Sequence, residues 1–177
     1  IPYNLNYLAQ ALAVDETSIF SNYYNWLHTV LKERGIEAEF LKKHLQALKN
    51  VLKRELDQQE FNFIQNFLNQ ADLSFKEADS HYKSFIDADN LLAEEAEKYL
   101  SLLLEMKREE AVKYILDLVD QGITIEDIYL KIFQNVQYEI GRLWQLNQIS
   151  IAQEHYATSV TQLAMSQLYP KIFTSFK

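Results

Sequence analysis

Residues that interrupt helices are scarce in this chain, which holds only three Gly and two Pro among 177 residues. Strand-rich folds need more turn residues than that, because tight reversals of the chain favour Gly and Pro. The stretches between these residues are rich in Leu, Glu, Lys, Gln and Ala, which favour helix. The sequence therefore predicts an all-α fold, and its 48% hydrophobic content is ample for a sizeable core.

Apolar residues recur at helical spacing in two groups. We expect the first group to form an N-terminal helical subdomain over residues 1–75, with helices at 4–14, 15–34, 37–54 and 57–70. The stretch at 76–89 loses this pattern and gains Asp and Ser, so we interpret it as a linker. The second group predicts a C-terminal four-helix bundle over residues 90–177, with helices at 91–105, 107–121, 124–145 and 150–173.

Several helix ends carry recognisable signals. Thr124 with Asp127 and Ser150 with Gln153 have the spacing of a capping box, in which each residue satisfies the other's backbone N–H. Other expectations about the helices, on where they end, kink or face inward, depend on single residues. We expect caps at Asp15 or Thr17 and at Asp89 or Asn90, stops at Gly35 and Gly122, inward-facing Leu5 and Phe40, and a kink or end at Pro170.

The net charge of −8 opposes non-specific binding to nucleic acid or to an anionic membrane. No apolar run approaches the roughly 20 residues that span a bilayer, and no signal peptide is visible. The absence of Cys excludes disulfides and thiol chemistry and is typical of a cytoplasmic protein. We therefore expect a cytoplasmic protein without a nucleic-acid or membrane partner.

Chemistry-bearing residues gather between residues 137 and 156, where one helix ends and the next begins. Trp144 closes the first helix, and Glu154 and His155 lie in the first turn of the second. The short loop between them predicts that indole, carboxylate and imidazole converge at one end of the bundle. Gly141 would allow close approach of a flat ligand, and Glu139 with Arg142 would pair on the helix surface.

The segments E-I-G-R-L-W and Q-I-S-I-A-Q-E-H resemble the helical cap beside the cobalamin-binding domain of methionine synthase and related corrinoid proteins. The Trp-to-Glu-His spacing is also similar to that of adenosylcobalamin-dependent photoreceptor regulators. The resemblance covers roughly residues 90–175. It implies that the upper axial face of a corrinoid contacts a small set of residues, namely Gly141, Trp144, Ile151, Glu154 and His155.

Two departures from these families limit what the resemblance implies. The photoreceptor regulators have a His directly after the Trp, whereas this chain has Gln145, which places light-driven ligation of cobalt by such a His in doubt. The D-x-H-x-x-G motif of the corrinoid-holding domain is absent. We expect this chain to be a fragment whose partner is a downstream corrinoid-binding domain, with cobalamin bound only when that domain is present. A homo-oligomer is a further possible partner.

Plainer readings stand beside this one. Trp144 is also typical of a core aromatic, Glu154 of a first-turn acid that suits the helix dipole, and His155 of a structural histidine. The chain would then be a cofactor-free interaction or dimerisation module; a third reading is the cap of a methylcobalamin-dependent methyltransferase. The segment 1–75 does not resemble the DNA-binding domain of the photoreceptor regulators and looks like the helical segment before the cap in some bacterial corrinoid sensors.

No nucleophile elbow, Gly-rich phosphate loop or metal-ligand spacing is present, so we expect no metal site and no catalysis by this chain itself. Three other histidines are lone residues on helical stretches, namely His28, His44 and His81. We expect each to lie on the surface or to be a hydrogen-bonded residue of the core. The N-terminal half also has an aromatic cluster that indicates core packing, with a chromophore or haem pocket as the alternative. Its members are Tyr23, Tyr24, Trp26, Phe61, Phe63 and Phe67.

Overall fold

The computed structural model describes residues 2–73, 83–87 and 89–174. Within these ranges the regular structure is helical and no strand occurs, which confirms the predicted all-α class. The chain divides into two compact units, residues 1–81 and 82–177. No helix in the described ranges combines the length and the apolar character that a bilayer span requires.

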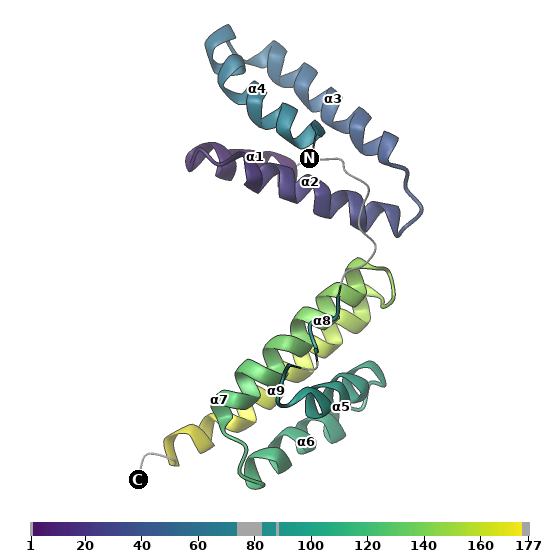
Figure 1. The fold of residues 1–177 in the computed structure, drawn as a ribbon, viewed down its shortest axis with the longest axis vertical. Coiled ribbons are helices and arrows are strands. Elements are labelled where there is room, and N and C mark those ends of the chain that lie inside the picture. Colours follow the sequence, from purple (N-terminus) through teal and green to yellow (C-terminus); the bar gives the residue numbers. More distant parts are fainter. Residues whose placement is uncertain (1, 74–82, 88, 175–177) are drawn as a thin grey trace. The chain divides into compact units, whose positions relative to one another are not determined.

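The first unit consists of two helical hairpins (Figure 1). Its helices are α1 (Pro2–Ala13), α2 (Thr17–Lys32), α3 (Ala38–Glu55) and α4 (Gln58–Leu73). Helix α2 packs against the other three. The chain leaves α2 through Gly35, whose φ of +75° is favoured by glycine. The N–H of Ile36 then bonds the carbonyl of Leu31 at 2.9 Å, so the predicted stop at Gly35 is confirmed.

Three expectations for this unit are wrong. The cap of α2 is Glu16, whose side chain accepts from the N–H of Ser18, because Asp15 adopts a left-handed backbone and Thr17 is already helical. Phe40 is 64% exposed, since the buried stripe of α3 runs through the neighbouring Leu41 and Phe40 falls outside it. Leu5 is also exposed, at 40%.

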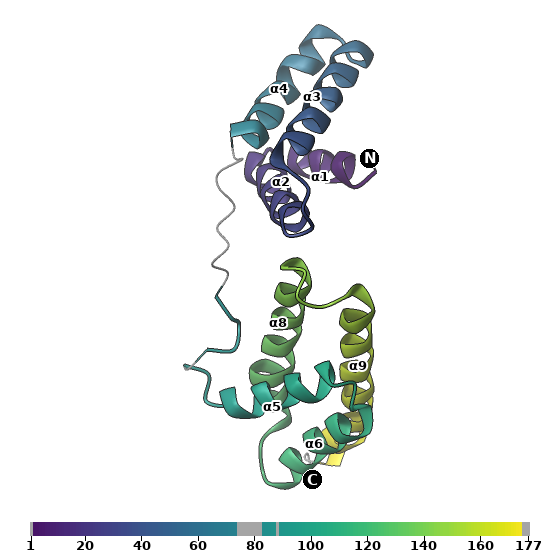
Figure 2. The ribbon, with the colours of Figure 1, turned by 90° about the vertical axis from the view of Figure 1, so that its right-hand side faces the viewer.

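The described residues of the second unit form four helical rods, as predicted for the bundle. They are α5 (Ala93–Leu104), α6 (Arg108–Asp120), the continuous run of α7 (Ile125–Asp127), η1 (Ile128–Phe133) and α8 (Gln134–Gln145), and α9 (Ile151–Thr174). Figure 2 shows α8 and α9 side by side, joined by a short loop, with α5 crossing them. Helix α9 continues through Pro170, so the helix does not end at that residue.

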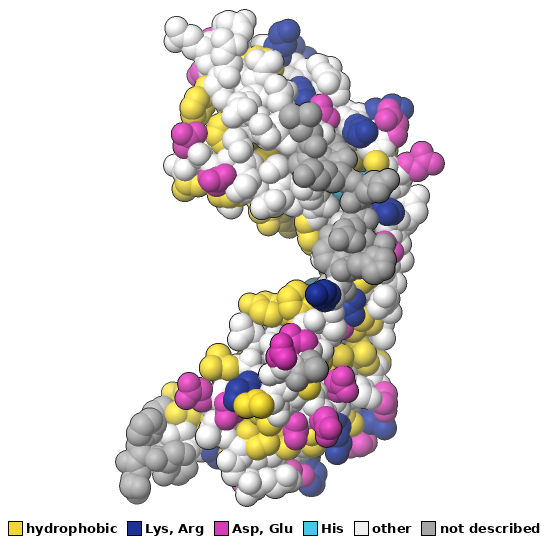
Figure 3. Space-filling view, viewed as in Figure 1, with side chains coloured by type: hydrophobic (Ala, Val, Ile, Leu, Met, Phe, Trp, Pro, Cys, Tyr) yellow, Lys and Arg dark blue, Asp and Glu magenta, His cyan; other side chains and the backbone are white. Residues whose placement is uncertain are grey.

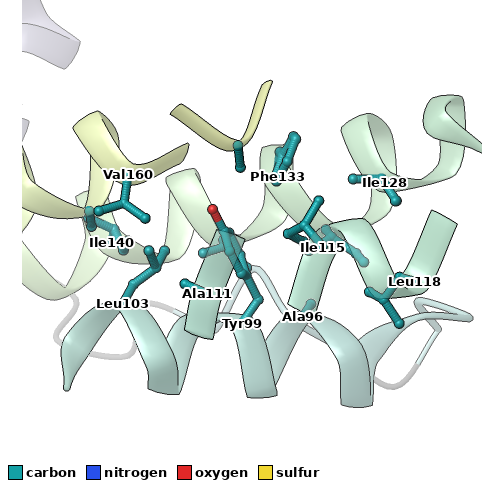
Figure 4. Packing of buried hydrophobic residues seen from close by; sticks show 14 of the residues in the cluster. Ala96, Tyr99, Leu103, Ala111, Ile115, Leu118, Ile128, Phe133, Ile140 and Val160 are labelled. Atoms are coloured by element: carbon teal, nitrogen blue, oxygen red, sulfur yellow. The ribbon is translucent and has the colours of Figure 1, made fainter. Parts of the chain in front are cut away.

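The core of this unit is formed where α5 and α6 meet the long rods. Four apolar residues at helical spacing on the third rod, Ile128, Ile132, Val136 and Ile140, are at most 1% exposed. Figure 4 shows Tyr99 standing among the aliphatic side chains, with its hydroxyl directed away from α5. Burial raises the pKa of Tyr99 to about 12, so the phenol stays protonated.

A π-helical turn, η1, interrupts the third rod over Ile128–Phe133. The N–H of Gln134 bonds the carbonyl of Tyr129, five residues earlier, instead of the usual four. Within this turn the adjacent residues Ile132 and Phe133 are both buried, at 0% and 1% exposure. Burial of Phe133 was not predicted, because a regular α-helix would turn it away from the stripe.

The residues before α5 lie along α8 and form what we call the strap, residues 83–87 and 89–90. Ile86 is buried in the core, and the ring of Phe85 contacts that of Tyr138. Asn90 accepts from the N–H of Leu92 and donates to the carbonyl of Lys131 at 2.7 Å. The predicted cap at Asp89 or Asn90 is therefore wrong, because α5 begins at Ala93 with Leu92 as its N-cap. Residues 76–82 and 88 of the predicted linker lie outside the described residues, as do residues 74–75 before it.

Acidic and basic side chains are interspersed over the face of the molecule that Figure 3 shows. The ion pairs include Lys113 with Asp117 and Lys131 with Asp127, each at helical i,i+4 spacing. Such exposed pairs contribute little to stability, because water and salt screen them.

Candidate functional site

The connection between α8 and α9 is a tight reversal. The N–H of Leu146 bonds the carbonyl of Arg142, and that of Gln148 bonds the carbonyl of Leu143 at 2.9 Å. Asn147 takes a φ of +56°, a left-handed conformation that Asn tolerates well. Ile149 is 8% exposed and anchors the loop in the core.

The start of α9 is fixed by a complete capping box. The N–H of Ser150 donates to Oε1 of Gln153 at 2.9 Å, and the N–H of Gln153 donates to Oγ of Ser150 at 3.2 Å. The predicted S-x-x-Q box is confirmed. The related prediction at the start of α7 is confirmed in one direction, since Thr124 accepts from the N–H of Asp127 at 3.1 Å.

The expected apolar site residues lie at these adjoining helix ends. Trp144, in the last turn of α8, is half-buried and packs against the core. Gly141 lies one turn earlier and is exposed, with no atom within 4 Å of the place where a Cβ would stand. Ile151, the first residue of α9, is 58% exposed. The two helix ends therefore present the apolar side chain of Ile151 and the unobstructed backbone of Gly141, both within seven residues of Trp144 in the sequence.

The expected polar residues form a pair in the first turn of α9. Nδ1 of His155 lies 2.5 Å from Oε2 of Glu154. The side chain of His155 is 71% exposed and that of Glu154 is 28% exposed. The carboxylate also faces the positive end of the helix dipole. Glu154 is thus held at the surface with part of its carboxylate open to a ligand.

The Glu139–Arg142 pair differs from the prediction. Its two hydrogen bonds, from Nε at 2.9 Å and from a terminal nitrogen at 2.6 Å, confirm the pairing. It does not lie on the surface, however, because Glu139 is 4% exposed and also accepts from the backbone N–H of Phe85 at 3.0 Å. The sequence could not show that the strap covers α8 at this point.

The pKa of Glu139 reflects opposing influences. Burial alone would raise it, but the hydrogen bonds from Arg142 and from the N–H of Phe85, together with the charge of Arg142, lower it below its ordinary value. The carboxylate therefore stays ionised. The same pair raises the pKa of Arg142. We interpret this group as the fastening of the strap to α8.

A hydrogen-bond network that sequence reasoning missed connects the core to the Glu154–His155 pair. Tyr99 contacts Thr161 at 3.1 Å, Gln137 donates to Thr161 at 2.9 Å, and Thr158 contacts Gln137 at 3.0 Å and Glu154 at 3.4 Å. These residues come from α5, α8 and α9. Helical spacing places Thr158 one turn after Glu154, but nothing in the sequence pairs either with Gln137.

The other described histidines, His28 and His44, belong to the first unit. His28 is buried in α2, and burial, together with Lys32 and Lys42, lowers its pKa. His44 contacts Asn4 at 3.4 Å, and His81 lies outside the described residues. Within the part of the chain that the structure describes, no three His, Asp or Glu side chains group as a metal site would require.

The N-terminal aromatic cluster is only partly a core feature. Tyr23, Tyr24, Phe61 and Phe67 are buried in the first unit, as core packing requires. Trp26 and Phe63 are 40% and 57% exposed, so the prediction of a core role is wrong for these two. Their side chains fall at the edges of the buried stripes of α2 and α4.

Comparison with known proteins bears on the second unit. Residues 95–169 match the family model described as "B12 binding domain". No curated protein and no solved structure matches the chain. The matched segment begins in α5 and ends in α9, so it contains every expected site residue. This part of the chain is therefore a helical cap domain of the kind found in cobalamin-binding proteins, as the resemblance implied.

The residues at the helix ends suit one face of a large, flat cofactor. Ile151 offers exposed apolar surface, Gly141 leaves its surroundings open, and Glu154 offers a charged acceptor. Together they supply apolar contact and one polar anchor, a combination that suits a flat cofactor whose axial substituent carries polar groups. The chain thus contains a cobalamin-related helical module.

Proposed function

We propose that this chain is a cobalamin-binding regulatory module whose second unit covers the upper axial face of a corrinoid. A corrinoid-binding domain downstream in the parent protein would hold the cofactor from below. One observation carries the proposal: Trp144, Ile151 and the Glu154–His155 pair occupy the adjoining ends of α8 and α9, inside the segment that matches the B12 binding domain.

Each side chain has a role in this proposal. The indole of Trp144 packs on the upper ligand, with its inner side supported by the core. Ile151 contributes apolar contact beside it, and Glu154 and His155 provide hydrogen bonds to polar groups of that ligand. When bound, the corrinoid would supply a cobalt–carbon bond whose breaking changes the upper ligand. The chain itself would contribute binding contacts and no reacting group.

A sensory output follows from the position of these residues. The contacts come from the ends of two helices that are joined by one short loop, so a ligand that engages them constrains both rods together. Loss of the upper ligand removes those contacts and shifts the preferred packing of the unit against its partner domain. Such a shift is limited by the difference in binding energy between the two arrangements.

The test compares tryptophans in the two units. In the protein extended through its downstream domain, we expect Trp144→Ala to weaken retention of adenosylcobalamin and methylcobalamin about tenfold, which corresponds to about 1.4 kcal/mol of lost packing. Trp26→Ala, at a 40% exposed position in the first unit, is the matched control and should retain both. Equal retention by the Trp144→Ala variant and the wild type would refute the upper-face assignment.

The isolated chain provides a second measurement. Its addition to either cobalamin should leave the absorption spectrum of the cofactor nearly unchanged, because the proposal assigns most of the binding surface to the partner domain. Tight binding by the chain alone would show that the site lies elsewhere in these 177 residues.

A further inference from the structure

The network behind Glu154 has a definite direction, which follows from counting its protons. The Thr161 hydroxyl has one proton and donates it to the carbonyl of Ala157 at 3.0 Å. The Thr161 hydroxyl must then be the acceptor in its hydrogen bonds with Tyr99 and Gln137. Tyr99 is consequently the donor of its pair, in keeping with a buried phenol that keeps its proton.

This count fixes the orientation of the Gln137 amide. Because Thr161 has no proton left to give, the amide group of Gln137 that faces it must be the NH₂. The amide oxygen of Gln137 then faces the hydroxyl of Thr158 at 3.0 Å. Gln137 therefore presents an acceptor to Thr158 because of bonds made in the core.

Thr158 also has one proton and two acceptors within reach. The oxygen of Gln137 is 3.0 Å away, whereas Oε1 of Glu154 is 3.4 Å away, near the outer limit for a hydrogen bond. The nearer acceptor takes the proton. Among the described residues, Oε2 of Glu154 is engaged by His155 at 2.5 Å, whereas Oε1 has the long contact to Thr158 alone.

We propose that Gln137 is a positioning residue which, by accepting the proton of Thr158, keeps Oε1 of Glu154 available as an acceptor for a hydrogen-bond donor on the upper ligand. The inference rests on the proposed function and names its ligand class: an upper ligand with hydroxyl or amino donors, such as an adenosyl group, rather than a methyl group. Gln137 holds the proton of Thr158 away from Glu154, so the ligand meets no competing donor.

The test removes the acceptor on Gln137 and then removes the competing proton. Gln137→Met keeps an unbranched side chain of similar length but releases the proton of Thr158 to Glu154. In the protein extended through its downstream domain, we expect the dissociation constant of adenosylcobalamin to rise about tenfold, the effect of one hydrogen bond to a charged group. That of methylcobalamin should stay within about twofold of wild type, because a methyl group donates no hydrogen bond.

The double variant Gln137→Met with Thr158→Val separates this role from a structural one. It removes the competing proton, so the adenosyl-to-methyl affinity ratio should return to within about twofold of wild type. Thr158→Ser keeps the hydroxyl and is the matched control, expected to behave as wild type. Equal weakening of both cobalamins by Gln137→Met, no weakening of either, or failure of the double variant to restore the ratio would overturn the inference.

Further results separate a failure of this inference from a failure of the proposed function. If Gln137→Met does not fold, Thr158→Val alone decides: it should leave the adenosyl-to-methyl ratio unchanged or shift it towards adenosylcobalamin, and a shift towards methylcobalamin would overturn the inference. Absence of cobalamin binding by the wild type would overturn both proposals. Wild-type binding that Trp144→Ala weakens and Gln137→Met leaves intact would overturn this inference alone.

Discussion

Replacement of Glu139 tests how strongly the strap is fastened to α8. Glu139→Gln removes the charge but keeps an oxygen that accepts from the N–H of Phe85. The main loss falls on Arg142, which keeps its charge and loses both bonds to a carboxylate. Breaking a buried pair by removing one partner costs about 3–5 kcal/mol. The side chain of Arg142 is 15% exposed and gains some water contact, so we expect the lower end, about 3 kcal/mol.

The sign of the pH dependence follows from the lowered pKa of Glu139 in the folded protein. Above the ordinary value of 4.5 the carboxylate is ionised in both states, and its stabilisation is fully present. As the pH falls through the lower folded value, the unfolded chain has already bound its proton and the stabilisation disappears. The free energies of unfolding of wild type and Glu139→Gln should therefore converge at acid pH.

The two tryptophans make the assay specific to the second unit. A Trp26→Phe background leaves Trp144 as the reporter of that unit, so urea unfolding followed by fluorescence measures the free energy of unfolding there. Glu126→Gln, at an exposed position, is the control and should change stability by less than about 0.5 kcal/mol. Our reasoning is refuted if Glu139→Gln matches wild type at pH 7, or if their difference stays constant down to pH 3.

Two further substitutions test local features of the same unit in the same assay. Ser150→Ala breaks both bonds of the capping box that depend on its hydroxyl and should lower the free energy of unfolding by about 1 kcal/mol; an unchanged value would show that the box does not stabilise α9. Tyr156 has a buried hydroxyl that finds no hydrogen-bond partner among the described residues, and it lines an open pocket of about 420 Å³ with residues 106–110. Tyr156→Phe should leave stability unchanged or raise it by up to about 1 kcal/mol, and a loss greater than that would contradict this assignment.

Features set by neighbours along the chain were the ones predictable from the sequence. The box at Ser150 and Gln153 depends on residues three apart, and the stop at Gly35 depends on one backbone conformation. The apolar stripe through Ile132 and Val136 is likewise a local pattern. Such features are favoured by the same short-range geometry in any protein, so their prediction did not require knowledge of the fold.

Features that depend on contacts between distant segments were not predictable. The burial of Glu139 requires Phe85, which is 54 residues away in the sequence. The hydrogen bond between Gln137 and Thr158 depends on how α8 is rotated about its axis relative to α9. No sequence pattern in either helix predicts that rotation. The assignment of Trp144 and Glu154 to a corrinoid face depends on a ligand and a domain beyond these contacts, and it stays a prediction.

The π-helical turn has a consequence for how this domain tolerates insertions and deletions. A π turn accommodates one residue more than an α turn, and each residue of an α-helix advances the direction of side chains by about 100°. Because the wider turn absorbs that extra residue, the face that α8 turns towards α9 is kept in spite of it. Loss of one residue between Ile128 and Phe133 would convert the π turn into an α turn and leave Gln137, Gly141 and Trp144 facing their present direction. Loss of one residue from α8 before Gln137 would instead rotate all three together by about 100°. The π turn is thus the place in this rod where one residue can be lost without redirecting α8.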